Sequence, residues 1–222
     1  DNASDGDTVF VFNGTYNEGL TIKKTISLIG QNKYTTFIDG SNIQNRVGVV
    51  FLKYGNGILV TGFTIQNGVR YSFYEAGVNI WTNNNIITDN IIKGNKDGIR
   101  IYGNYNTISE NIIRDNNKYG INLYDSNHNT VINNIFKSGD GLYITCNVED
   151  PYESWGSHNI MNNTANGKPI YYYGNQNDII VPYDASQVIL ANCYNCIVKN
   201  LSISNMDVGI LIGGDSFFNH VL

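Results

Sequence analysis

The stretch Gly77-Val78-Asn79-Ile80-Trp81 recurs as Gly98-Ile99-Arg100-Ile101-Tyr102 and again as Gly120-Ile121-Asn122-Leu123-Tyr124. The glycines that open these stretches lie 21 and 22 residues apart, and Gly141 opens a further copy 21 residues later. Between the copies the chain is rich in Asn, Gly and β-branched residues, which favour strands and turns. A fixed period of this length is typical of a solenoid in which each repeat forms one coil.

The alternation inside each copy separates inward from outward side chains. Successive residues of a strand face opposite sides, so Val78 and Ile80 point inward while Asn79 and Trp81 point outward. A single coil cannot bury its apolar face, whereas coils stacked about 4.8 Å apart bury a continuous core. We therefore predict an all-β fold, a right-handed parallel β-helix with coils of about 21 residues and three short strands per coil.

Stacking aligns the asparagines of successive coils into columns. One predicted column contains Asn90, Asn111, Asn134, Asn163 and Asn200, and a second contains Asn85, Asn106, Asn129 and Asn195. Stacked side-chain amides can pass hydrogen bonds from coil to coil. Asn also tolerates the left-handed backbone of a sharp bend. We interpret these asparagines as structural.

The repeat extends in both directions and predicts one β-helix domain over residues 1–222. Further copies open at Gly48, Pro169, Gln187 and Gly209. Insertions interrupt the period near residues 70–75 and 146–157. Solenoid ends need polar caps, and none is recognisable at either end of this sequence. We expect a piece of a longer protein, or partner subunits that stack end to end or pack laterally on the outward apolar residues Ile189 and Leu211.

The composition excludes two classes of partner. Charged residues make up 15% of the chain, and the formal net charge is −5. No basic stripe is present, so we expect no nucleic-acid partner. No apolar run reaches the length of a membrane-spanning helix, so we expect no membrane span.

The three cysteines, Cys146, Cys193 and Cys196, are an odd number, which argues against a disulfide framework. Cys193 and Cys196 form a C-x-x-C motif in which the repeat places Cys196 on the outward face. A metal site needs more ligands than this pair, and His128 and His158 belong to other coils. We therefore expect no metal site and no cofactor, except that calcium stays open at an acidic loop.

Outward positions of the repeat carry aromatic residues. The predicted carbohydrate-binding set is Trp81, Arg100, Tyr102, Tyr124, Tyr143, Tyr171, Tyr173 and Trp155. Rings at neighbouring heights offer flat apolar faces to a sugar chain, and amide or guanidinium groups offer donors to its hydroxyls. The alternative is that the rings only stabilise the sheet through contacts between adjacent strands.

The insertion near residues 146–157 carries acidic residues beside the aromatic face. Glu149, Asp150 and Glu153 are the candidates for a glycosidase acid/base pair. They are equally consistent with calcium ligands for an acidic polysaccharide or with a solvated loop. Elsewhere the carboxylates are scattered over different faces, which leaves an enzymatic function uncertain and less favoured.

Two groups of segments resemble a known family. They are Gly6-Asp7-Thr8-Val9, Asn13-Gly14-Thr15-Tyr16 and Lys24–Gly30 near the start, and Asn166–Tyr173 and Gln187–Cys193 further on. These segments resemble archaeal β-helix surface proteins with repeats of this type, which are often described as similar to NosD, a periplasmic component of copper maturation. The resemblance implies the fold and a periplasmic or cell-surface location, but it does not imply one activity, because the fold also serves pectate lyases, tailspikes and adhesins.

Three functional hypotheses follow. The leading one is an extracellular or cell-surface module that binds a polysaccharide or cell-surface glycan, or that has a structural or assembly role. The second is a glycoside hydrolase or lyase that acts on cell-surface glycan. The third is a NosD-like periplasmic scaffold for copper maturation. A groove with clustered acidic side chains would favour the second, and three convergent Cys, His or Met side chains would favour the third.

Overall fold

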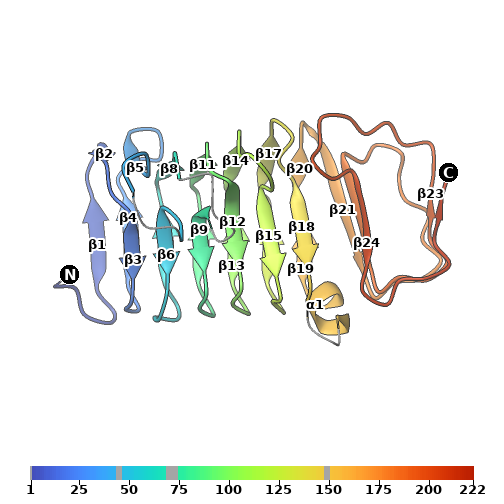
Figure 1. Ribbon diagram of the computed structural model, residues 1–222, viewed down its shortest axis with the longest axis horizontal. Coiled ribbons are helices and arrows are strands. Elements are labelled where there is room, and N and C mark those ends of the chain that lie inside the picture. Colours follow the sequence, from blue (N-terminus) through green and yellow to red (C-terminus); the bar gives the residue numbers. More distant parts are fainter. Residues whose placement is uncertain (1, 44–46, 69–74, 148–150) are drawn as a thin grey trace.

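A computed structural model describes residues 2–43, 47–68, 75–147 and 151–222 of the chain and shows the predicted right-handed parallel β-helix (Figure 1). Sheet 1 stacks β1 (Thr8–Val11), β4 (Ser27–Gly30), β7 (Leu59–Thr61), β10 (Ile86–Thr88), β13 (Thr107–Ser109), β16 (Thr130–Ile132) and β19 (Asn159–Met161). Sheet 3 stacks β3 (Leu20–Ile22), β6 (Val50–Leu52), β9 (Ala76–Ile80), β12 (Asp97–Ile101), β15 (Ile121–Tyr124) and β18 (Leu142–Thr145).

Sheet 2 starts as the third wall of the helix and then continues beyond it. Its first part stacks β2 (Gly14–Tyr16), β5 (Thr36–Asp39), β8 (Thr64–Gln66), β11 (Ile91–Lys93), β14 (Ile112–Arg114), β17 (Ile135–Lys137) and β20 (Thr164–Ala165). It goes on through β21 (Lys168–Gly174), β22 (Gln187–Ala191) and β24 (Ile210–Gly213). β23 (Ile197–Val198) pairs with β25 (His220–Val221), and α1 (Tyr152–Gly156) follows β18.

The alternation of the repeat places the core as predicted in the main helix. Ile99 pairs with Val78 on one side and with Ile121 on the other, so equivalent residues stack in register. These side chains are fully buried in one continuous hydrophobic cluster. The residues expected to face inward from Val78 to Ile144 therefore do so.

Two asparagine ladders run through the main helix. Asn111 illustrates the pattern: its Oδ1 accepts hydrogen bonds from Asn90 N and Nδ2, and its Nδ2 donates to Ile87 O and to Asn134 Oδ1. Several ladder residues follow a residue in the left-handed conformation, such as Glu110 at φ 58°. The ladder amides satisfy backbone groups that the sharp bends remove from the sheets, which is why Asn recurs at these positions.

The ladders differ from the prediction at their ends. Asn195 and Asn200 lie outside them and are exposed. In the Asn85 column the next group after Asn129 is His158, whose Nδ1 accepts the Asn129 N–H at 3.2 Å. Burial lowers the pKa of His158 to about 4, which keeps the ring neutral and able to accept that bond.

The structure contains a third ladder that the sequence did not predict. Asn95 Oδ1 accepts from Gly68 N, and Asn116 Oδ1 accepts from Asn95 N. In the next coil the same position is held by Asp140, which accepts from Asn116 N at 3.2 Å. A carboxyl group thus replaces the amide at the end of this ladder.

The expected register fails after residue 165. Asn166 and Gly167 have φ values of 50° and 80° and form a two-residue turn, after which β21 pairs with β20 in the antiparallel sense. The repeat predicted that the stretch at Pro169 stacks on β18. The structure shows that it does not. Asn-Gly is the strongest short hairpin signal, whereas the repeat alone predicts a regular coil here.

The C-terminal strands have two buried faces. Ile189, which was expected to be outward, is buried in the main core together with Ile170, whereas Val188 and Leu190 form a second cluster with Cys193 and Cys196. Because both faces of these strands are apolar and buried, alternation predicted the face of Val188 and Leu190 but not the burial of Ile189 on the other face. One face of β21 and β22 therefore covers the C-terminal end of the main core.

Candidate functional site

The most ordered outward feature is a column of rings on sheet 3. Ring centroids are 5.0 Å apart for Phe51 and Trp81, 5.7 Å for Trp81 and Tyr102, and 5.0 Å for Tyr102 and Tyr124. Trp81, Tyr102 and Tyr124 hold the same position in successive coils, so their spacing is the spacing of the sheet. Phe51 on β6 is in register with Asn79, two residues before Trp81. Trp81 is 45% exposed and Phe51 is buried. The structure therefore brings the three predicted rings of the repeat together, and adds Phe51.

Arg100 lies in contact with this column. Its guanidinium carbon is 4.8 Å from the centroid of Tyr124 and 5.5 Å from that of Tyr102, and its Nη1 is 3.8 Å from Asp97 Oδ2. Both Arg100 and Asp97 are buried. Cation–π contacts of a partly desolvated guanidinium hold rings in place. Arg100 therefore supports the rings from its buried position on the sheet.

The neighbouring row on sheet 3 holds a second ring pair. Tyr143 stacks on Tyr119 with centroids 4.1 Å apart and planes 5° apart, and Lys118 Nζ lies 4.6 Å from the Tyr119 centroid. Burial raises the pKa of Tyr119, and the neighbouring Tyr143 raises it further. The Tyr119 phenol thus stays a neutral donor at physiological pH.

The other predicted aromatic residues lie elsewhere. Tyr171 and Tyr173 are on β21, with ring centroids 6.2 Å apart, and pack against the second hydrophobic cluster. Trp155 is in α1 and packs on the main core, and its carbonyl accepts a bond from Tyr172 Oη at 2.6 Å. These three residues do not extend the sheet 3 column, because β21 does not stack on β18.

The acidic loop is only partly described. Glu149 and Asp150 lie outside the described residues. Glu153 is exposed in α1, and its Oε2 is 3.7 Å from Nε2 of His128, whose ring stacks on Tyr105. Within the described ranges no group of three His, Cys, Asp or Glu side chains is arranged to hold a metal ion.

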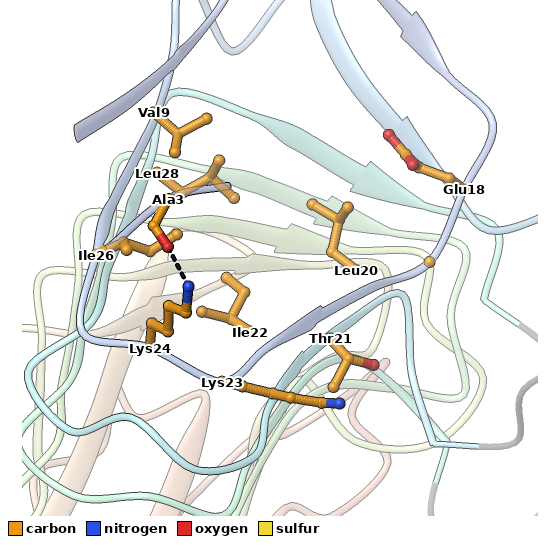
Figure 2. A pocket seen from close by; sticks show the side chains of 11 residues that line it. Ala3, Val9, Glu18, Leu20, Thr21, Ile22, Lys23, Lys24, Ile26 and Leu28 are labelled. Carbon is orange, nitrogen blue, oxygen red and sulfur yellow. Dashed lines mark hydrogen bonds between the residues drawn. The ribbon is translucent and has the colours of Figure 1, made fainter. Parts of the chain in front are cut away.

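Two hollows are present in addition. One, of about 700 Å³, lies at the N-terminal end of the helix, where Val9, Leu20, Ile22, Ile26 and Leu28 line it beside Lys24 (Figure 2). Its apolar walls are inward-facing side chains of the first two coils, and Lys24 Nζ donates a hydrogen bond to Ala3 O. This hollow is the end of the hydrophobic core rather than a polar site.

The second hollow is an aromatic recess near the C-terminus that the sequence analysis missed. It measures about 620 Å³ and is lined by Tyr152, Asn177, Asn192, Tyr194, Asp215, Phe217 and Phe218. Tyr194 and Phe217 occupy the same place in consecutive coils and are joined by a β-bridge. The sequence therefore does contain a repeated aromatic position here. It was not recognised because the repeat period changes in this part of the chain.

The cysteines are the side chains of this chain that would be expected to bind a soft metal such as copper. Cys193 and Cys196 are fully buried, so the expectation that Cys196 faces outward was wrong, through a register slip of one residue. Cys146 is half-buried in another coil. His158 uses one ring nitrogen on Asn129 N, and its other lies 3.1 Å from Ser154 O. No three of these groups converge within the described residues.

Comparison with known proteins gives one match. Residues 1–180 match the model of a family described as periplasmic copper-binding protein (NosD). No curated protein and no solved structure matches the chain. In the described part of the chain, no helix has the length and apolar character required to cross a membrane.

Proposed function

The chain belongs to the NosD family, and from this premise we propose that it is an extracytoplasmic, non-catalytic β-helix that binds a polysaccharide along the ring column of sheet 3. The column of Phe51, Trp81, Tyr102 and Tyr124 carries the proposal. It is a repeated outward feature that runs along the helix axis, as a bound linear chain would.

The geometry of the rings supports a sugar ligand. Trp81 offers the most exposed ring, and Tyr102 and Tyr124 are each partly exposed beside it. Adjacent rings are inclined by 74° and 50° instead of lying in one plane. Such a surface alternates apolar faces with ring edges, and it matches the alternating CH-rich faces and hydroxyl rims of a saccharide chain.

The family match supports the proposed location. Members are described as periplasmic, and the polar, Asn-rich chain has a net charge of −5. A binding surface of this kind serves a periplasmic or cell-surface protein, where polysaccharide is present. The ligand class is a periplasmic or cell-surface glycan.

Copper is the ligand that the family description implies, and the described residues do not fit it. Copper sites are built from converging Cys, Met or His side chains. Within the described part of residues 1–180, no three His, Cys, Asp or Glu side chains are arranged to hold a metal ion. Both ring nitrogens of His158 are engaged, and the ring of His128 stacks on Tyr105. Cys193 and Cys196 lie beyond the matched region, and burial raises the pKa of Cys193, which disfavours the thiolate that would bind a metal.

A glycan panel tests the proposal. The purified chain is passed through native gels containing neutral or acidic polysaccharides, and retarded migration is expected with at least one of them. The same mixtures are assayed for new reducing ends and unsaturated products. Retardation without new products supports a binding module, products show an enzyme, and no retardation by any glycan contradicts the proposal.

A further inference from the structure

The C-x-x-C motif spans a bend that also occurs in the main helix. In Thr82–Asn85 the third residue, Asn84, has φ 59°, and the first and fourth side chains meet, with Asn85 Nδ2 3.0 Å from Thr82 Oγ1. In Cys193–Cys196 the third residue, Asn195, has φ 54°. The first and fourth side chains, Cys193 and Cys196, also interact with each other.

The next coil shows the same bend directly beside the cysteines. Ser216 Oγ accepts the Cys193 N–H at 2.9 Å, and Asn219 Oδ1 accepts the Cys196 N–H at 2.8 Å. Phe218, the third residue of that bend, also has φ 54°. The two cysteines therefore occupy the first and fourth positions of a ladder bend, the positions at which Thr82 and Asn85 form a hydrogen-bonded pair.

The two sulfur atoms face one small core. Cys193 Sγ lies 3.2 Å from Tyr173 O, and Cys196 Sγ lies 3.8 Å from Gln176 O. Both side chains are fully buried and belong to the second hydrophobic cluster. Burial raises the pKa of Cys193, and its contact with Cys196 raises it further. Both cysteines are free thiols in this structure, and besides these carbonyl oxygens each side chain interacts with the other.

We propose that Cys193 and Cys196 form an intramolecular disulfide that closes this bend, so that the pair is a covalent staple and not a copper site. A disulfide requires Cβ atoms about 4 Å apart, which the bend provides when its first and fourth side chains touch. The oxidising periplasm of the family favours such a bond. This inference does not depend on the glycan proposal.

The oxidant is a small-molecule or protein disulfide. One cysteine loses its proton, and its thiolate attacks the disulfide, which gives a mixed disulfide and releases one thiol. The second thiolate then attacks the cysteine sulfur of the mixed disulfide and releases the second thiol. The chain loses two protons and two electrons, and the two released thiols carry them away. Exchange takes place before the bend is buried, because both sulfurs are inaccessible in the folded chain.

Counting free thiols tests the proposal. The whole chain is folded in a mixture of reduced and oxidised glutathione, denatured without reductant, alkylated and weighed. One alkylated cysteine, Cys146, is expected, against three after reduction. The Cys146→Ser variant is expected to show none, and Cys193→Ser to show two. Reduction of the wild type is expected to lower Tm by a few degrees, as loss of a short-loop disulfide does.

The variants separate the possible outcomes. Three alkylated cysteines in the wild type would overturn the proposal, because both thiols then stay reduced in the folded chain. Two alkylated cysteines in Cys146→Ser would overturn it as well, since the bond would then involve Cys146. The number of alkylated cysteines in the wild type tests the disulfide even if a variant fails to fold. A Cu(I) titration of the non-reduced wild type and of the double variant Cys193→Ser, Cys196→Ser gives a second readout. Each then has Cys146 as its one free thiol, so equal binding is expected, and extra binding by the wild type contradicts a closed disulfide.

Discussion

The backbone N–H of Asn116 donates to Oδ2 of Asp140 at 3.2 Å, in a column where Asn116 itself accepts from Asn95 at 3.0 Å. The carboxyl group thus acts as the last acceptor of an asparagine ladder. Its other oxygen, Oδ1, is buried and has no hydrogen-bond partner in the described structure. Burial raises the pKa of Asp140 to about 7. A protonated carboxyl resembles the amide it replaces, because it has one acceptor and one donor.

Asp140→Asn is therefore expected to stabilise the fold at pH 8 and to change its pH dependence. The folded wild type binds a proton at Asp140 that the unfolded chain has already lost between pH 4 and 7. The contribution of this proton to the free energy of unfolding is fully present below about pH 4 and is lost as the pH rises to about 7. An asparagine at this position would not titrate, so Asp140→Asn is expected to be more stable than the wild type by about 1–3 kcal/mol at pH 8. Urea melts between pH 4 and 8 measure it.

The exposed Asp215 provides the matched control. Asp215→Asn should leave the slope of stability against pH as in the wild type. If Asp140→Asn keeps the wild-type slope between pH 4 and 7, Asp140 is ionised in the folded chain and its place in the ladder has been misjudged.

Asn111→Ala tests the ladder itself. The substitution leaves Asn90 N and Ile87 O without their ladder partner in the core. Buried groups left unpaired cost about 1–3 kcal/mol each, so a loss of about 3 kcal/mol is expected in urea melts. Asn117→Ala, at an exposed position, is expected to cost less than about 0.5 kcal/mol. Asn104 is unsuitable as a control, because its Oδ1 accepts the Asn127 N–H at 2.7 Å.

The main helix was predictable because each level of the sequence agrees with the others. The period, the alternation of Val78 and Ile80, and the recurrence of Asn90 all favour one register. The exposure of the site was less predictable: Arg100 reads as outward by alternation, yet it is buried against Asp97 and the rings. Alternation reports which side of the strand a residue occupies, and not what else covers that side.

The C-terminal part was misread for a different reason. Its strands have two apolar faces, so alternation cannot identify the inward one, and Ile189 and Leu190 are equally plausible core residues. Only the Asn166-Gly167 turn distinguishes a reversal from another coil. The spacing of 28 residues from Gly141 to Pro169 was interpreted as an insertion, which hid that signal.

Gln187→Ala tests the junction between the main helix and the C-terminal strands. Gln187 Oε1 accepts the Leu142 N–H at 2.9 Å, and its Nε2 donates to Leu142 O at 2.7 Å and to Val208 O at 2.9 Å. Removing this buried amide leaves the last strand edge of sheet 3 without those partners. A loss of about 3 kcal/mol is expected in urea melts, together with faster hydrogen exchange of the Leu142 amide. Gln176→Ala, at an exposed position, should change neither. Unchanged exchange at Leu142 would show that the junction does not depend on this side chain.

Trp81→Ala tests the proposed glycan surface. Trp81 is the most exposed ring of the column and contacts the rings of both Phe51 and Tyr102. An aromatic contact contributes about 0.5–1.5 kcal/mol beyond its buried area, so a roughly tenfold rise in Kd is expected for whichever polysaccharide retards the wild type. Tyr34→Ala removes a ring that is 63% exposed and lies outside the column, and it should leave Kd unchanged. Tyr194→Ala removes a ring of the C-terminal recess. Loss of affinity in Tyr194→Ala with wild-type affinity in Trp81→Ala would move the binding surface to that recess and reject the column.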